Sequence, residues 1–69
     1  MSINAIRMMA EYWAGKIKEV MDDERSTRNR VFVAIREARE KAVIGCKMNE
    51  EDEGVFMNEL YVCIKGSGE

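Results

Sequence analysis

The sequence contains no histidine and no proline, and its five glycines are never adjacent. Histidine is the side chain that most often transfers protons near neutral pH, so the chain lacks the commonest general acid and base. Without a glycine-rich loop it also lacks the backbone cradle that binds nucleotide phosphates. The three serines, Ser2, Ser26 and Ser67, have no neighbouring base to activate them. We therefore expect a protein that is not an enzyme and that uses no cofactor.

Cysteine is also scarce, because only Cys46 and Cys63 occur and they form no paired motif. Two cysteines without any histidine make at most half of a zinc site, so no metal centre is expected. The first twenty residues mix charged side chains such as Arg7 and Lys16 with apolar ones, unlike a secretory signal peptide. No apolar run is long enough to cross a membrane. These features indicate the reducing cytoplasm, and both cysteines are expected to be small core residues.

The length of 69 residues restricts the chain to one small domain. A domain of this size buries only about 60% of the surface that its unfolded chain exposes. Such domains commonly need a disulfide, a metal or a partner chain to be stable. Because the first two are not expected here, the sequence predicts a homo-oligomer, most simply a homodimer.

The absence of proline and the supply of alanine, methionine, glutamate, lysine and arginine favour helix. We predict an all-α fold, a small antiparallel helical hairpin extended to a three-helix unit and completed by dimerisation. The expected helices span about 2–22, 24–46 and 49–65. Residues 1–65 then form a single helical domain, and residues 66–69 form a flexible tail.

The first expected helix has Ser2 as its N-cap and one broad apolar face. At 100° per residue, an arc of about 120° contains Ile3, Ile6, Ala10, Trp13, Ala14, Ile17, Val20 and Met21. Asp22, Asp23, Ser26 and Thr27 follow as candidate caps of the next helix. None of them is a glycine or proline, so one continuous long helix is the alternative.

The second expected helix directs Val31, Ile35, Ala38 and Ala42 to the core and ends near Gly45. The third begins at Asn49, where following acids stabilise the positive end of the helix dipole. Its core face contains Phe56, Leu60, Cys63 and Ile64. Alternatively, the β-branched and aromatic residues 60–64 form a strand, which would have to pair with a second copy of the chain.

Charge is divided unevenly along the chain. Residues 24–47 contain seven basic and three acidic residues, a net charge of +4, whereas residues 48–60 contain five acids and no base. This complementarity predicts that the two segments face each other, within one protomer or across a dimer.

An arginine stripe is the strongest indication of nucleic-acid binding. On a helix through residues 24–46, one stripe of about 80° collects Arg25, Arg28, Phe32, Arg36, Arg39 and Val43. Guanidinium groups bind phosphate, and an aromatic ring among them stacks on a base. Ordinary surface salt bridges produce the same pattern, and the acidic pI of about 5.2 argues against a dedicated DNA-binding domain.

Two further features point to a protein partner. Met8 and Tyr12 form a small apolar strip on the first helix, opposite its main apolar face, and such residues are frequent in interfaces. They are equally compatible with ordinary scattered surface residues. The acidic run of Glu50, Glu51, Asp52 and Glu53 resembles a phosphate mimic, although acids are also common at helix starts.

These observations favour a small non-catalytic protein–protein interaction module, an adaptor or inhibitor of a larger protein. Its tentative partner-binding residues are those of the Met8–Tyr12 strip and of the acidic run. The alternative is a small nucleic-acid-binding regulatory protein that uses the arginine stripe. In size and composition the chain is similar to small phage and prophage accessory proteins, but no motif supports that similarity.

Overall fold

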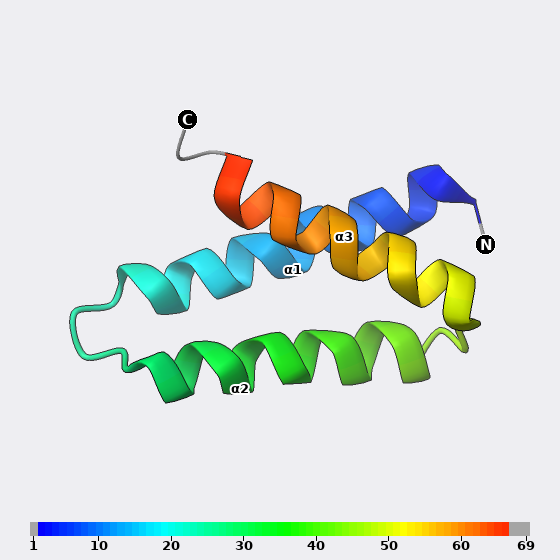
Figure 1. The fold of residues 1–69 in the computed structure, drawn as a ribbon. Helices are drawn as coiled ribbons and strands as arrows, with labels where there is room; N and C mark the ends of the chain where they lie inside the picture. Colours follow the sequence, from blue (N-terminus) through cyan, green and yellow to red (C-terminus); the bar gives the residue numbers. More distant parts are fainter. Residues whose placement is uncertain (1, 67–69) are drawn as a thin grey trace.

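The computed structural model describes residues 2–66, which contain three α-helices and one π-helical turn (Figure 1). The elements are α1 (Ile3–Asp22), α2 (Arg28–Arg39), the π-helical turn η1 (Glu40–Ile44) and α3 (Glu50–Gly66). Within residues 2–66 there is no strand, so the predicted all-α fold is confirmed and the strand alternative for the last segment is wrong. Helix α3 includes Gly66, and residues 67–69 of the expected tail lie outside the described part.

Helix α1 begins as the sequence predicts. The Ser2 hydroxyl oxygen accepts a hydrogen bond from the backbone N–H of Ala5 at 3.2 Å, which satisfies one free donor of the first turn. The middle of the predicted apolar face is buried and consists of Ile6, Ala10, Ala14 and Ile17. Ile3 and Met21 share this face but lie in the first and last turns, and both are exposed.

A capped turn separates α1 from α2. The Asp23 carboxylate accepts a hydrogen bond from the N–H of Arg25, and the Ser26 hydroxyl donates one to the backbone at the end of α1. The Thr27 hydroxyl oxygen then accepts a hydrogen bond from the N–H of Arg30 at 3.3 Å. Because these caps compete with helical bonding, α2 begins at residue 28 and not at 24. The continuous-helix alternative is therefore wrong.

The end of the second helix differs from the expected regular one. A π-helical turn fits an extra residue into a helical turn, so the residues after it leave the 100° periodicity. Val43, which we placed in the arginine stripe, is consequently buried, and Cys46, which we placed in the core, is exposed. Gly45 matters here because a Cβ at this position would collide with the carbonyl oxygen of Lys41.

The terminating residue is Lys47, whose φ of 54° is left-handed, whereas Gly45 is right-handed helical. The N–H of Met48 donates to the carbonyl of Val43, and that of Lys47 donates to the carbonyl of Ile44. This pair of bonds is a Schellman motif with Lys47 in the position that glycine usually occupies.

Helix α3 begins with an asparagine cap, as predicted. The Asn49 side-chain oxygen accepts a hydrogen bond from the N–H of Asp52 at 2.8 Å. Phe56 and Leu60 are fully buried, while Cys63 and Ile64 pack against the core at its edge. The cap and this amphipathic face outweigh the strand propensity of residues 60–64.

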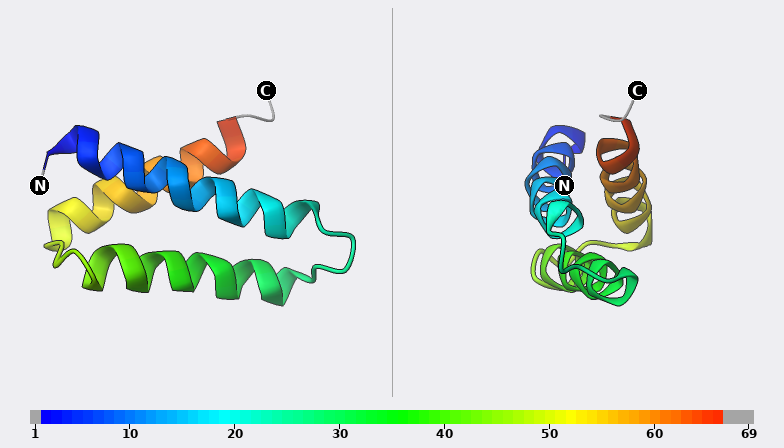
Figure 2. Two further views of the ribbon diagram at one scale, coloured as in Figure 1. Left: turned by 180° about the vertical axis from the view of Figure 1, so that it is seen from behind. Right: turned by 90° about the vertical axis from the view of Figure 1, so that its left-hand side faces the viewer.

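Helix α1 is the helix on which both α2 and α3 pack. It packs most extensively on α3 and also on α2, whereas α2 and α3 make few contacts with each other in residues 2–66. The end-on view in Figure 2 shows α2 below α1 and α3, with α3 beside α1. The smallest dimension of the backbone is 14 Å, which is the width of two packed helices, because their axes lie about 8–10 Å apart and each Cα cylinder has a radius of about 2.3 Å. The unit is therefore flat, and much of each helix faces solvent.

Candidate functional site

The Met8–Tyr12 strip lies on the outer face of α1. Both side chains are strongly exposed, at 69% and 60%, on the side opposite the buried residues. Tyr12 is nevertheless held in place: its ring makes an edge-to-face contact with Trp13 at 5.3 Å, and the Lys16 amine lies 5.1 Å from the ring centroid. A pre-positioned, exposed aromatic ring loses little conformational freedom on binding, which suits it to anchor a partner.

The acidic run surrounds the first turn of α3 and does not form one face. Successive residues of a helix point about 100° apart, so the four carboxylates point in different directions. Glu50 and Glu51 are exposed, whereas Asp52 and Glu53 are partly buried. Glu53 is bound to Arg39 of α2, with 2.6 Å between Oε2 and Nε. The run therefore presents two exposed acids, on a different part of the molecule from the outer face of α1.

The arginine stripe is shorter than the sequence suggested. Arg25 lies in the turn before α2, because the helix begins only at residue 28. Arg28, Phe32 and Arg36 are all exposed on α2, and 62% of Phe32 is accessible. Arg39 is engaged by Glu53, as the complementary charges of the two segments predicted.

The Arg39–Glu53 ion pair shows which side of α2 faces α3. Seven residues separate Phe32 from Arg39, and seven residues return a helix to within about 20° of the same direction. Phe32 therefore points to the same side as Arg39. Toward the start of α2 the two helices diverge (Figure 1), and 62% of Phe32 is exposed.

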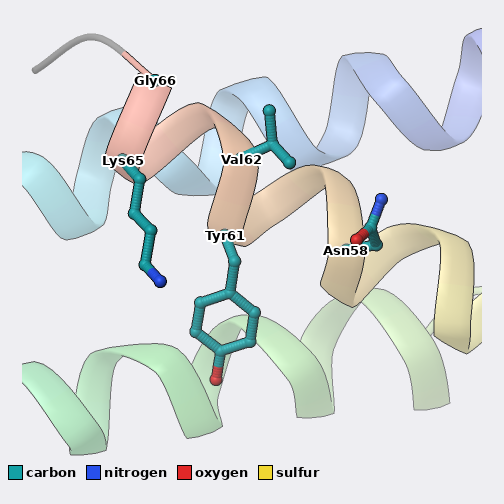
Figure 3. Close-up of a pocket in the computed structure, with 5 residues that line it drawn as sticks. All are labelled: Asn58, Tyr61, Val62, Lys65 and Gly66. Atoms are coloured by element: carbon teal, nitrogen blue, oxygen red, sulfur yellow. The ribbon is translucent and has the colours of Figure 1, made fainter. Parts of the chain in front are cut away.

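On α3, the exposed aromatic residue comparable to Phe32 is Tyr61. Figure 3 shows its ring extending from α3 in the direction of α2, with Lys65 on the same side one turn later. Tyr61 is 43% exposed and helps to line a shallow hollow of about 340 Å³ at the end of α3. We call the surface formed by Arg28, Phe32, Arg36, Tyr61 and Lys65 the α2–α3 face.

The sequence analysis predicted a helix over 49–65 but assigned no role to Tyr61. A helical projection separates Tyr61 from the core residues Phe56 and Leu60 by about 100° or more. That signal was present in the sequence and was not used. The direction of the Tyr61 ring toward α2 had no sequence signal.

Comparisons of the chain with protein-family models, curated proteins and solved structures found no match. None of the helices in residues 2–66 has the length and apolarity required to span a membrane.

Proposed function

We propose that this chain is a non-catalytic protein–protein interaction module, an adaptor or inhibitor of a larger protein in the cytoplasm. One observation carries the proposal: the described residues expose more large apolar side chains than they bury. Nine are exposed, whereas only five of the nine buried core residues are larger than alanine: Ile6, Ile17, Val43, Phe56 and Leu60. A small core beside extensive exposed apolar surface is typical of a domain that a partner completes.

The outer face of α1 is the first candidate for that contact. Met8 and Tyr12 are the large apolar residues at its centre, and Tyr12 is already positioned by Trp13 and Lys16. Since the opposite side of α1 is covered by α2 and α3, a contact here would bury both faces of the helix. The partner in this contact is a larger protein or a second copy of the chain, or the same face binds the two at different times.

The test is affinity capture from the native host's lysate, with and without nuclease, read by mass spectrometry. We expect one protein to be captured stoichiometrically after nuclease treatment. The double variant Met8→Asp and Tyr12→Asp should reduce its recovery by about tenfold or more, because acidic side chains cannot replace apolar anchors. Circular dichroism should show unchanged helix content, since both residues are exposed.

The control is the variant Asn29→Asp and Asn58→Asp, which adds the same charge at exposed positions on α2 and α3, away from the outer face of α1. It should capture the partner normally. If the Met8 and Tyr12 variant also captures normally, the outer face of α1 is not the contact. Capture of nucleic acid that disappears with nuclease would instead support the regulatory nucleic-acid-binding protein, for which the exposed Arg28, Phe32 and Arg36 are the supporting observation.

A further inference from the structure

The α2–α3 face combines two exposed aromatic rings on adjacent helices. Phe32 is 62% exposed on α2, and Tyr61 is 43% exposed on α3. The Arg39–Glu53 ion pair connects the two helices at one end, and the helices diverge toward the other end, as Figure 1 shows. An apolar surface of a partner would therefore fit between the two rings, with Phe32 on one side and Tyr61 on the other.

Most of the charged side chains near these rings on α2 and α3 are positive. Between residues 28 and 36, α2 contains three arginines and no acid. In residues 57–66 of α3 the only acid is Glu59, which is bound to Arg7 of α1, with 3.1 Å between Oε1 and Nε. Arg28, Arg36 and Lys65 are exposed. Glu37 and Glu40 follow Arg36 within the next turn, and Glu40 lines a hollow with Arg39 and Glu53 at the end where the two helices meet. The apolar rings are thus bordered by cations.

We propose that the α2–α3 face binds an acidic amphipathic helix of another protein. The inference rests on the proposed function and specifies the chemistry of the partner. A helix with an apolar stripe would contact Phe32 and Tyr61 and complete a four-helix arrangement. Glutamate or aspartate beside that stripe would pair with Arg28, Arg36 and Lys65, and this charge complementarity selects an acidic helix over a basic one.

The probe is a set of three fluorescent helical peptides of about 18 residues, roughly five turns. All have leucines at i, i+3, i+4 and i+7 spacing, and their flanking residues are glutamate, glutamine or lysine. Fluorescence anisotropy with the full chain should give the tightest binding for the glutamate peptide and none for the lysine peptide. Raising the salt concentration should weaken the glutamate peptide most, because it alone uses the cations.

Adjacent residues of α2 provide matched variants. Phe32→Ala should weaken the glutamate peptide about tenfold or more, as expected of an aromatic anchor. Val33→Ala, which changes a 57% exposed residue that points about 100° away from Phe32 around α2, should have less than about a twofold effect. Arg28→Glu should weaken binding, and Arg30→Glu, with the same charge change, should not. Arg30 and Val33 both line a separate hollow beside the end of α1.

Equal binding of the three peptides, or equal effects of the paired variants, would overturn the proposal. A labelled single-stranded oligonucleotide that binds more tightly than the glutamate peptide would assign the face to nucleic acid instead. A dimer in analytical ultracentrifugation that Phe32→Ala dissociates would assign it to a second copy of the chain. If the α2–α3 face fails these tests while the Met8 and Tyr12 variant still loses a captured protein, the proposed function stands without this inference.

Discussion

Lys47 occupies a backbone conformation that glycine adopts far more readily. Its φ of 54° places the Cβ close to the neighbouring carbonyl, a contact that glycine avoids. The Schellman bonds from Lys47 and Met48, together with the packing of Met48 on the core, hold this residue in position. A small amount of unfavourable backbone energy is therefore retained at the end of the second helix.

We expect Lys47→Gly to raise the free energy of unfolding by about 0.5–1 kcal/mol. Relief of the left-handed conformation outweighs the greater flexibility that glycine gives the unfolded chain. Urea denaturation followed by circular dichroism measures the change. Lys47→Ala is the control: it removes the same charge but keeps the Cβ, so it should not stabilise the protein. Stabilisation by both variants would show that the charge, and not the backbone, is responsible.

At the scale of elements, each of the three α-helices begins at a polar cap. Ser2, Thr27 and Asn49 each accept a hydrogen bond from the backbone N–H of the residue three positions later. The cap of α3 is the most consequential. It directs residues 60–64, which have strand propensity, into a helix whose apolar face packs on α1.

Removal of this cap should destabilise the whole unit. We expect Asn49→Ala to lower the free energy of unfolding by about 1 kcal/mol, because the N–H of Asp52 loses its acceptor. Asn58→Ala makes the same chemical change at an exposed position inside α3 and should be neutral or slightly stabilising, since alanine favours helix. Thermal and chemical denaturation of the two variants measure the difference. Equal destabilisation by both would contradict a capping role for Asn49.

The whole molecule is a flat three-helix unit with a small core. Of the nine buried residues in the described part of the chain, four are alanines, which contribute little apolar area. Large apolar residues remain exposed on the outer face of α1 and on the α2–α3 face. This distribution is the physical basis for expecting that association with another chain contributes to stability.

If the protein self-associates, its melting temperature should rise with protein concentration, because mass action favours the associated folded state. Differential scanning calorimetry across a hundredfold range of concentration measures this rise, and analytical ultracentrifugation gives the stoichiometry. A melting temperature independent of concentration, with a monomer throughout, would exclude the homo-oligomer and leave a different protein as the partner.

The sequence by itself determined the helices, their caps at Ser2 and Asn49, and most of the core face. These features depend on local hydrogen bonds and on the 3.6-residue period, which a single sequence contains. It also predicted the attraction between the basic and acidic segments, which the structure places in the Arg39–Glu53 pair. The exposure of Met8 and Tyr12 followed from the same periodicity.

Only the tertiary structure decided the rest. The π-helical turn buries Val43 and exposes Cys46, and no helical projection anticipates it because it changes the period itself. The late start of α2 removes Arg25 from the arginine stripe, since several residues competed equally to cap that helix. Phe32 and Tyr61 come to flank one face because α2 and α3 each pack on α1 and diverge from each other. Such relations depend on how whole helices are oriented in space, which local sequence does not encode.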